Sequence, residues 1–478
     1  MVVNAHETKT KIVCTIGPAC KDPNVLSRMI REGMDVARIN FSHGTCKDNL
    51  ALIDLVRRVA EQENATVAVL ADLQGPKLRI GRLAEPVDLR RGDWVSLTTG
   101  PADGRHHVIP LPHPELITGA KVGERLLFDD GLIETVVREV RPETLVADVV
   151  IGGRLDSNKG IAAPGSTGRL SALSDKDRSD AVSATRYGVD FIALSFVQTS
   201  EDVQQLRAHI DQEPGGAEVA IVAKIEKREA LEHLDEILDV SDAIMVARGD
   251  LGIEVPPQNV PFYQKEIIRR CNRIGVPVIT ATQMLQSMVD HLRPTRAEAS
   301  DVANAILDGT DAVMLSAETA VGDHPVDAVA MMREISAIAE MQMRSRFDDV
   351  PFASVEHVHP ITDAISDATA RIAADLDARL IAVSTVSGYT ARQIARERPR
   401  EPIVAMTPTE HVSRQLAMVW GVTPMLVPLY NGTDDMLKTL SRVLLDSGSA
   451  ERGDIVVVSA GIPSGVLGKT NFIKVHRI

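Results

Sequence analysis

Runs of apolar residues recur along this chain, and helix-like segments separate them. Near the start, and again between residues 189 and 319, each run is short, almost continuously apolar, and ends in polar or charged residues. Such runs are typical of parallel strands buried on both faces, because the helices between them cover the sheet. The predicted strands span residues 11–16, 34–39, 66–71, 189–195, 221–226, 244–251, 278–283 and 313–318.

Eight strand–helix units of this kind are what a (β/α)8 barrel requires, so the pattern predicts an α/β fold built on a TIM barrel. The alternation by itself leaves a doubly wound open sheet as the alternative. The helix before the fourth strand begins at Ser174-Asp-Lys-Asp177, which has the spacing of a capping box.

Two further regions depart from this alternation. Residues 75–168 contain short alternating runs between Gly, Pro and Asp, which predicts a small inserted β-barrel domain. After a polar linker at 344–360, strand-like runs resume and predict a C-terminal α/β domain. We therefore assign residues 1–73 and 169–342 to the barrel, 74–168 to the inserted domain and 343–478 to the C-terminal domain. A domain inserted at the carboxyl end of a barrel strand can act as a lid.

The composition excludes several classes of function. Hydrophobic residues make up 44% and charged residues 25% of the 478 residues, as in soluble globular proteins. A net charge of −14 and an aromatic content of 3% argue against nucleic-acid binding, which needs a basic face and stacking platforms. No apolar stretch is long enough to span a bilayer, and the first residues lack the apolar core of a secretory signal. The four cysteines lack metal-ligand spacing, so we expect a cytoplasmic protein.

Polar side chains gather at the carboxyl ends of the predicted strands, which meet on one rim of a closed barrel. Lys224 and Glu226 share one face of their strand because they are two residues apart. Glu226 and Asp250 supply carboxylate oxygens that suit Mg²⁺, an ion that keeps water and substrate phosphate in its other positions. Thr282 and Glu318 end the next two strands. A salt-bridged rim without chemistry is the alternative.

Cations at other strand ends indicate a phosphorylated ligand. Arg38 ends the second strand and can bind a phosphoryl oxygen through two N–H groups. His43 follows in the next loop, where a purely structural role is the alternative. Lys77 and Arg79 follow the third strand, and Lys159 lies at the return crossing, so these cations are expected at the base of the lid.

A hydroxyl-rich loop in the C-terminal domain predicts a second anion site. It follows a predicted strand and precedes a helix, and backbone N–H groups at such a position bind phosphate. Helix capping alone would explain one Ser or Thr, and it is the alternative. The expected effector contacts are Ser384, Thr385, Ser387, Gly388 and Thr390.

Six long motifs follow one another along the chain. They are Thr10-Lys-Ile-Val-Cys-Thr-Ile-Gly-Pro18, Arg38-Ile-Asn-Phe-Ser-His-Gly44, Ala223-Lys-Ile-Glu226, Met245-Val-Ala-Arg-Gly-Asp-Leu-Gly252, Ala281-Thr-Gln-Met284 and Arg293-Pro-Thr-Arg-Ala-Glu298. With them the chain closely resembles bacterial-type pyruvate kinases over essentially its whole length. The resemblance implies a barrel, a β domain that closes over the site, a regulatory C-terminal domain and a homotetramer. It also implies phosphoryl transfer from phosphoenolpyruvate to ADP, giving pyruvate and ATP, with control by a phosphorylated effector.

The resemblance gives roles to the strand-end residues. Glu226 and Asp250 correspond to the Mg²⁺ ligands, with Mn²⁺ as a substitute ion, and Lys224 to the group that stabilises the phosphoryl group and the enolate. The amides of Gly249 and Asp250, with the Thr282 hydroxyl, would bind the substrate carboxylate. Thr282, or water that it orders, could relay the proton to the enolate, and the sequence leaves both open.

The remaining cations receive phosphate-binding roles in the same way. Arg38 would hold the phosphate of phosphoenolpyruvate. Arg79 and Lys159 resemble contacts to the nucleotide phosphates, and His43 is a further nucleotide-binding candidate.

One motif departs from the pattern of K⁺-dependent family members. Those members carry Thr-Lys-Gly-Pro-Glu where this chain has Leu73-Gln-Gly-Pro-Lys77. A fixed ammonium from Lys77 could replace the monovalent cation, because one unit charge at about 5 Å and an effective dielectric of about 20 contributes roughly 3 kcal/mol. We therefore expect catalysis that does not require K⁺. The positions that match the family's K⁺ ligands are Asn40, Ser42, Asp72 and Leu73.

Two other functions compete with this interpretation. A metal-dependent aldolase or lyase could share the carboxylates and the enolate, but it would not need the inserted domain or a nucleotide site. A scaffold protein without activity would be expected to lose at least one residue of the predicted site. The effector's identity, the preferred nucleoside diphosphate and any cooperativity are not readable from the residues.

Overall fold

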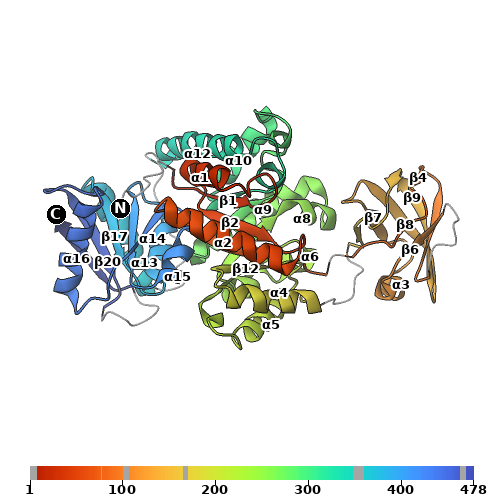
Figure 1. The fold of residues 1–478 in the computed structure, drawn as a ribbon, viewed down its shortest axis with the longest axis horizontal. Coiled ribbons are helices and arrows are strands. Elements are labelled where there is room, and N and C mark those ends of the chain that lie inside the picture. The colour runs from red at the N-terminus through yellow and green to blue at the C-terminus, as the bar shows by residue number, and fades with distance from the viewer. Residues whose placement is uncertain (1–7, 77, 101–106, 165–170, 348–359, 463–469) are drawn as a thin grey trace.

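The computed structural model describes residues 8–76, 78–100, 107–164, 171–347, 360–462 and 470–478. The chain forms three parts in a row, with a central barrel between the C-terminal domain and the inserted β domain (Figure 1). The two smaller parts therefore meet opposite ends of the barrel.

The central part is a closed eight-stranded parallel barrel, which confirms the TIM barrel and removes the open sheet as an alternative. Almost every strand residue is buried, as the continuous apolar runs predict. Around the ring the order is β1 (Lys11–Thr15), β16 (Ala312–Leu315), β15 (Val278–Ala281), β14 (Ala243–Ala247), β13 (Ala220–Ile225), β12 (Phe191–Leu194), β3 (Ala68–Asp72) and β2 (Val36–Asn40).

Helices cover the outside of the barrel and pack on alternate strand residues. The predicted capping box at Ser174 is present, because its side chain accepts from the Asp177 amide and the Asp177 carboxylate accepts in return. The main covering helices are α1 (Pro23–Glu32), α2 (Cys46–Gln62), α4 (Asp175–Arg186), α5 (Ser200–Ile210), α7 (Leu234–Val240), α9 (Val260–Ile274), α10 (Arg296–Leu307) and α12 (Pro325–Phe347). Short helices at the strand ends are α6 (Arg228–Glu232), α8 (Arg248–Glu254) and α11 (Ala317–Ala320).

The inserted part is an all-β domain with one short helix, α3 (Pro114–Gly119). Its ladders form a six-stranded and a two-stranded sheet around one apolar core, so the described residues of this part form a small β domain of two sheets. The strands are β4 (Val87–Leu89), β5 (Trp94–Thr98), β6 (Val108–Pro110), β7 (Arg125–Phe128), β8 (Ile133–Arg141), β9 (Thr144–Ile151), β10 (Gly153–Leu155) and β11 (Ile161–Ala162).

The C-terminal part is an α/β domain, as predicted. Separate apolar clusters lie on the two faces of its five-stranded sheet. The sheet order is β19 (Val422–Leu426), β18 (Ile403–Thr407), β17 (Leu380–Ser384), β20 (Ile455–Ala460) and β21 (Phe472–Arg477). The helices are α13 (Pro360–Asp375), α14 (Tyr389–Ala395), α15 (Glu410–Leu416) and α16 (Thr433–Asp446).

The C-terminal domain closes the amino-terminal end of the barrel. Met418, which follows α15, is buried in the same apolar cluster as the inward-facing strand residues Val13 and Leu70. Beside this contact, the buried carboxylate of Asp190 accepts from Arg414 Nε at 2.6 Å and pairs with Arg57 at 2.7 Å. The carboxyl-terminal rim is thus left as the end of the barrel that faces the inserted domain.

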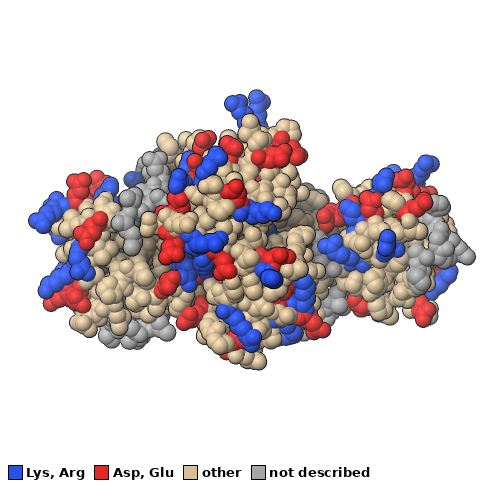
Figure 2. Space-filling model, in the orientation of Figure 1, with Lys and Arg blue, Asp and Glu red and all other residues tan. Residues whose placement is uncertain are grey.

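The surface carries charges of both signs. On the face shown in Figure 2, basic and acidic side chains are interspersed, and no field of one sign covers a whole domain. Within the described ranges, no helix is both long and apolar enough to cross a membrane.

Candidate active site

A buried lysine occupies the middle of the carboxyl-terminal rim. Lys224, near the end of β13, contacts three oxygens: Ser195 Oγ at 2.7 Å, Glu226 Oε1 at 2.9 Å and Asp72 Oδ1 at 3.2 Å. Burial opposes the charge of Lys224, but the two carboxylates outweigh it and hold its pKa above the ordinary value. The rim therefore presents an ammonium that stays charged.

Asp72, the last residue of β3, joins this lysine to Arg38. Its carboxylate accepts from Arg38 Nε at 2.7 Å, and Arg38 Nη1 donates to Thr15 Oγ1 at 2.8 Å. Burial favours the neutral acid of Asp72, but the charges of Lys224 and Arg38 overcome it and lower its pKa. The arginine is thereby fixed at the rim, with its guanidinium mostly shielded from solvent.

The two carboxylates predicted to hold a metal come together next to this cluster. Glu226 follows β13 and its Oε2 accepts from the Phe196 amide at 2.7 Å, while Asp250 lies in the first turn of α8. Burial raises the pKa of Glu226; the charge of Lys224 lowers it, and the negative charge of Asp250 raises it again. A divalent cation between the two carboxylates would relieve this repulsion, so the residues present fit Mg²⁺.

The metal would have few protein ligands. Within the part of the chain that the structure describes, no group of three or more His, Cys, Asp or Glu side chains is arranged to hold an ion. A site of two carboxylates leaves the remaining octahedral positions to water and to substrate oxygens, which is how Mg²⁺ is commonly held at phosphate sites.

Thr282 is held in an unusual backbone conformation directly after β15. Its φ is 70°, and that of Gln283 is 55°, a region that β-branched residues rarely adopt. The Thr282 hydroxyl accepts from the Gly249 amide at 2.8 Å. This contact joins the turn after β15 to the first turn of α8, where Asp250 lies.

A cleft opens where the inserted domain meets the rim. The cleft encloses about 700 Å³, a volume that includes space open to solvent. Glu226, Asp250 and the ion pair of Lys227 with Glu254 line the barrel side. The side of the inserted domain consists of Pro76, Leu78, Leu127, Asp130, Gly131 and residues 160–163.

The cations expected at the base of the lid are found at the crossing between the domains. Arg79 forms a bridge with Gly160 and donates from Nη1 to the Asn158 carbonyl at 3.1 Å. Lys159 pairs with Asp129 at 2.8 Å. Neither side chain lines the cleft, and His43 is exposed in the loop after β2. Lys77 lies outside the described residues.

The positions that match K⁺ ligands have protein partners. Asp72 is paired as above, Asn40 Oδ1 accepts from the Ser42 amide at 3.0 Å, and the Leu73 carbonyl accepts from Ser195 Oγ at 2.8 Å. The Ser42 side chain is exposed. Asp72 Oδ1 has the Lys224 ion pair but no hydrogen bond, and the Asn40 and Leu73 oxygens have one protein partner each.

The hydroxyl-rich loop of the C-terminal domain is only partly open. Thr390 is buried and its hydroxyl bonds that of Thr470 at 2.9 Å, and Thr385 is also buried. Ser384 and Ser387 stay partly exposed, and Gly388 takes a φ of 75°. A cation that the sequence did not single out, Arg392, donates to the Ser387 carbonyl at 3.3 Å. Arg392 lies in the first turns of α14, the helix that follows the loop, and this position could have revealed it.

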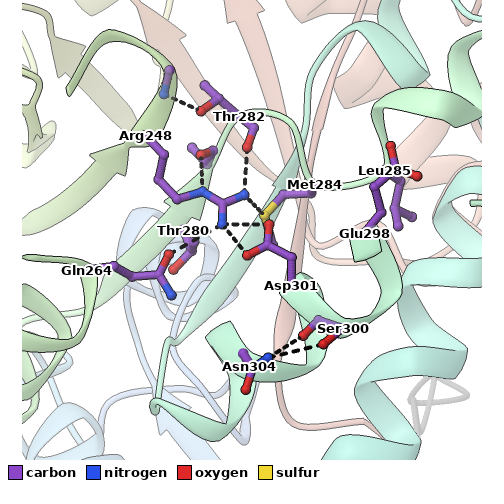
Figure 3. Close-up of polar contacts among 12 residues, drawn as sticks. Arg248, Gln264, Thr280, Thr282, Met284, Leu285, Glu298, Ser300, Asp301 and Asn304 are labelled. Atoms are coloured by element: carbon purple, nitrogen blue, oxygen red, sulfur yellow. Dashed lines mark hydrogen bonds and ion pairs between the residues drawn. The ribbon is translucent and has the colours of Figure 1, made fainter. Parts of the chain in front are cut away.

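Two more residues of the main site escaped the sequence-based prediction. Ser195, which holds Lys224, ends the fourth predicted strand, and its place at a strand end could have revealed it. Arg248 contacts the turn at Thr282 from beneath, as Figure 3 shows, although its motif was noted only as a whole. By contrast, Glu318 accepts from the amides of Leu285 and Ser316, which is a structural use of its carboxylate.

Comparison with known proteins gives one family for the whole chain. The model "Pyruvate kinase, barrel domain" matches residues 7–329 and "Pyruvate kinase, alpha/beta domain" matches residues 363–476. A pyruvate kinase of Geobacillus stearothermophilus is 44% identical over 473 residues, which is 98% of this chain and 80% of the relative. A pyruvate kinase of Staphylococcus epidermidis is 41% identical over 476 residues, with the same coverage of 98% and 80%.

A solved structure agrees in fold. The crystal structure of a pyruvate kinase from Cryptosporidium parvum superimposes with a TM-score of 0.90 at 36% identity, covering 99% of this chain and 97% of that one.

Proposed function

The chain belongs to the pyruvate kinase family of phosphotransferases, and from this we propose that it transfers the phosphoryl group of phosphoenolpyruvate to ADP, giving pyruvate and ATP. One observation carries the proposal: Lys224, Arg38 and the carboxylates of Glu226 and Asp250 converge at one rim of the barrel beside a cleft. A fixed cation cluster next to a paired carboxylate site suits a reaction that moves negative charge between oxygens.

Glu226 and Asp250 would hold Mg²⁺, or Mn²⁺ in its place. When bound, the ion would add a positive charge that polarises the oxygens of the substrate. The remaining positions of its coordination sphere are free for water and phosphate, since the protein offers two carboxylates here.

The protein's own groups account for the rest of the reaction. Arg38, fixed by Asp72 and Thr15, would orient the phosphoryl group as its bond to the enol oxygen breaks and a bond to the ADP β-phosphate forms. Lys224 would stabilise the charge on the phosphoryl oxygens and then on the enolate. Its raised pKa keeps it charged at neutral pH.

The substrate carboxylate would be bound by the Thr282 hydroxyl and by the amides of Gly249 and Asp250. The Gly249 N–H would then exchange the Thr282 oxygen, its acceptor in this structure, for the carboxylate. Thr282, or water that it orders, would deliver the proton that converts the enolate into pyruvate. Its hydroxyl already accepts from the Gly249 amide, so the O–H proton is available to a second acceptor.

Closure of the inserted domain would complete the nucleotide site. We extend the proposal to residues 74–168 as a lid, with 1–73 and 169–342 as the catalytic barrel and 343–478 as the regulatory domain. In this structure the residues that line the cleft do not include Arg79, Lys159 or His43. They would reach the ADP phosphates only after the inserted domain closes.

Independence from K⁺ is part of the proposal. The ion pairs of Asp72 with Lys224 and Arg38 support it, because two fixed cations already lie against this carboxylate. The added charge would come from Lys77. Addition of KCl to an assay free of Na⁺ and K⁺ should leave the rate unchanged, and Lys77→Glu should make the rate depend on K⁺. A rate that rises many-fold with KCl in the unmodified protein contradicts this part.

The effector site and the assembly stay predictions. Ser384, Thr385, Ser387, Gly388 and Thr390 would bind a phosphorylated small molecule, with the partly exposed Ser384 and Ser387 as the strongest contacts. A homotetramer in the cytoplasm is implied by the family resemblance. Velocity against phosphoenolpyruvate, with and without sugar phosphates or AMP, tests the regulation.

The proposed reaction is tested by a lactate-dehydrogenase-coupled assay with phosphoenolpyruvate, ADP and Mg²⁺. Pyruvate formation that requires both ADP and phosphoenolpyruvate supports the kinase. Pyruvate released without ADP would indicate a lyase, and no turnover would indicate a scaffold.

A further inference from the structure

The turn that carries Thr282 is strained. Two consecutive residues other than glycine, Thr282 and Gln283, have φ values of 70° and 55°. Such a conformation costs of order 1–3 kcal/mol at each residue and persists only where the surroundings enforce it. Some group must therefore hold this turn in place.

Arg248 supplies that restraint. Its guanidinium lies against the turn and donates to three residues of it: Nε to the Ala281 carbonyl at 3.2 Å, Nη2 to the Thr282 carbonyl at 2.7 Å, and Nη2 towards the Met284 sulfur (Figure 3). A planar guanidinium can span these acceptors together because its N–H groups point in fixed directions.

The guanidinium is itself oriented from the outer layer of helices. Its Nη1 pairs with Asp301 of α10 at 2.7 Å and reaches Gln264 of α9 at 3.4 Å. The Arg248 side chain is only 11% exposed, whereas that of Asp301 is 40% exposed. The pair therefore ties the turn to two helices that lie outside the rim.

Arg248 also belongs to α8, so one residue links both parts of the predicted carboxylate site. The next residue, Gly249, donates its amide to the Thr282 hydroxyl at 2.8 Å. A Cβ added at Gly249 would lie 3.4 Å from that hydroxyl oxygen, which shows how closely the two segments approach. A change in the Arg248 contacts would therefore move the hydroxyl relative to the amide.

We propose that Arg248, oriented by Asp301, is a positioning residue that sets the Thr282 turn for binding the carboxylate of phosphoenolpyruvate. The inference rests on the proposed function, since it specifies how that site binds its substrate. Neither Arg248 nor Asp301 needs to touch the substrate. Their effect is specific to one substrate because the nucleotide cations Arg79 and Lys159 lie elsewhere, at the base of the lid.

The test separates the two substrates kinetically. In Asp301→Ala, we expect the KM for phosphoenolpyruvate to rise about tenfold, as for a lost hydrogen bond to a charged group, while the KM for ADP stays within about twofold. Asp301→Glu should recover most of the loss, because it restores the ion pair. In Arg248→Lys the KM for phosphoenolpyruvate should rise as in Asp301→Ala. The charge is kept, but an ammonium cannot span the carbonyls of residues 281 and 282 together with Asp301.

Asp235→Ala is the matched control. Asp235 pairs with Arg270 at 3.1 Å between α7 and α9, on the same outer layer of helices but without contact to the turn. Its loss should leave both KM values unchanged. A crystal structure of Asp301→Ala adds a readout that does not need activity, and we expect Thr282 to leave the left-handed region or to become disordered.

Two results would overturn the inference. One is an unchanged KM for phosphoenolpyruvate in both Asp301→Ala and Arg248→Lys; the other is an equal rise of the KM for both substrates. An unmodified protein that fails to phosphorylate ADP would refute the proposed function instead. In that case the crystal structure of Asp301→Ala tests the inference, and an unchanged φ at Thr282 overturns it.

Discussion

Replacement of Asp72 by Asn gives the sharpest test of the buried charge cluster. The substitution keeps the size of the side chain and removes one negative charge that lies between two cations. Lys224 would then be left with the Glu226 carboxylate, and Arg38 would lose its ion-pair partner. The structure predicts consequences for both stability and the pH dependence of the reaction.

The size of the effect follows from the distances. At an effective dielectric of about 20, the 3.2 Å contact of Asp72 with Lys224 contributes roughly 5 kcal/mol and the 2.7 Å contact with Arg38 about 6 kcal/mol. The cost of burying the charges offsets most of this energy. Removal of one partner from a buried pair usually costs about 3–5 kcal/mol, which is the expected loss in the free energy of unfolding.

The pH dependence has a definite sign. Lys224 has a raised pKa in the folded protein, so its stabilising effect is complete below the ordinary lysine value of about 10.4 and is lost as pH rises through the raised value. Without Asp72 the folded-state pKa of Lys224 falls. The alkaline loss of activity in Asp72→Asn should therefore begin at a lower pH than in the unmodified protein.

The measurement is kcat/KM for phosphoenolpyruvate from about pH 7 to about pH 11, a range that passes the ordinary lysine pKa and over which Lys224 of the unmodified protein should stay charged, together with denaturant unfolding. Asp190→Asn is the matched control, because Asp190 is also fully buried between two arginines, Arg57 and Arg414, but at the opposite end of the barrel. Asp190→Asn should lose a similar free energy of unfolding, but its kcat/KM at alkaline pH should follow that of the unmodified protein. An unchanged limb in Asp72→Asn, or an equal shift in Asp190→Asn, would refute the reasoning.

Three further substitutions test other parts of the structure. Gly75→Ala places a Cβ 2.6 Å from the Phe196 ring at a φ of 68°, so it should lower the free energy of unfolding by about 1–3 kcal/mol and reduce kcat; a fully active variant would contradict this. Met418→Ala should destabilise the protein to denaturant by about 2–5 kcal/mol with both KM values kept, and an unchanged transition would mean that the residue does not fill the barrel floor. Glu226→Gln should raise the Mg²⁺ concentration for half-maximal rate at least tenfold, because even residues that only hydrogen-bond to metal ligands cost about tenfold in metal affinity when they are replaced. An unchanged value would mean that Glu226 does not bind the metal.

Much of the architecture could be predicted from local patterns. Continuous apolar runs gave the eight barrel strands, because strands covered on both faces must be apolar throughout. The capping box at Ser174 was predictable because it depends on residues three apart. The convergence of Lys224, Glu226 and Asp250 followed once the strands were assumed to form a closed barrel, since parallel strand ends then share a rim.

The partners of those residues were not predictable in the same way. The position of Ser195 at a strand end places it on the rim, but its pairing with Lys224, like that of Asp301 with Arg248, joins different barrel units and depends on which side-chain rotamers pack together. The insertion of Met418 into the barrel floor likewise depends on how two domains dock.

The sequence by itself therefore determined the elements, their order and the chemical groups at each strand end, since these depend on near neighbours and on the periodicity of strands and helices. Only the tertiary structure decided which charges neutralise one another, which hydroxyl orients the lysine and which arginine holds the strained turn. The reason is physical: these interactions arise when closure of the barrel and docking of the domains bring distant segments within hydrogen-bond distance.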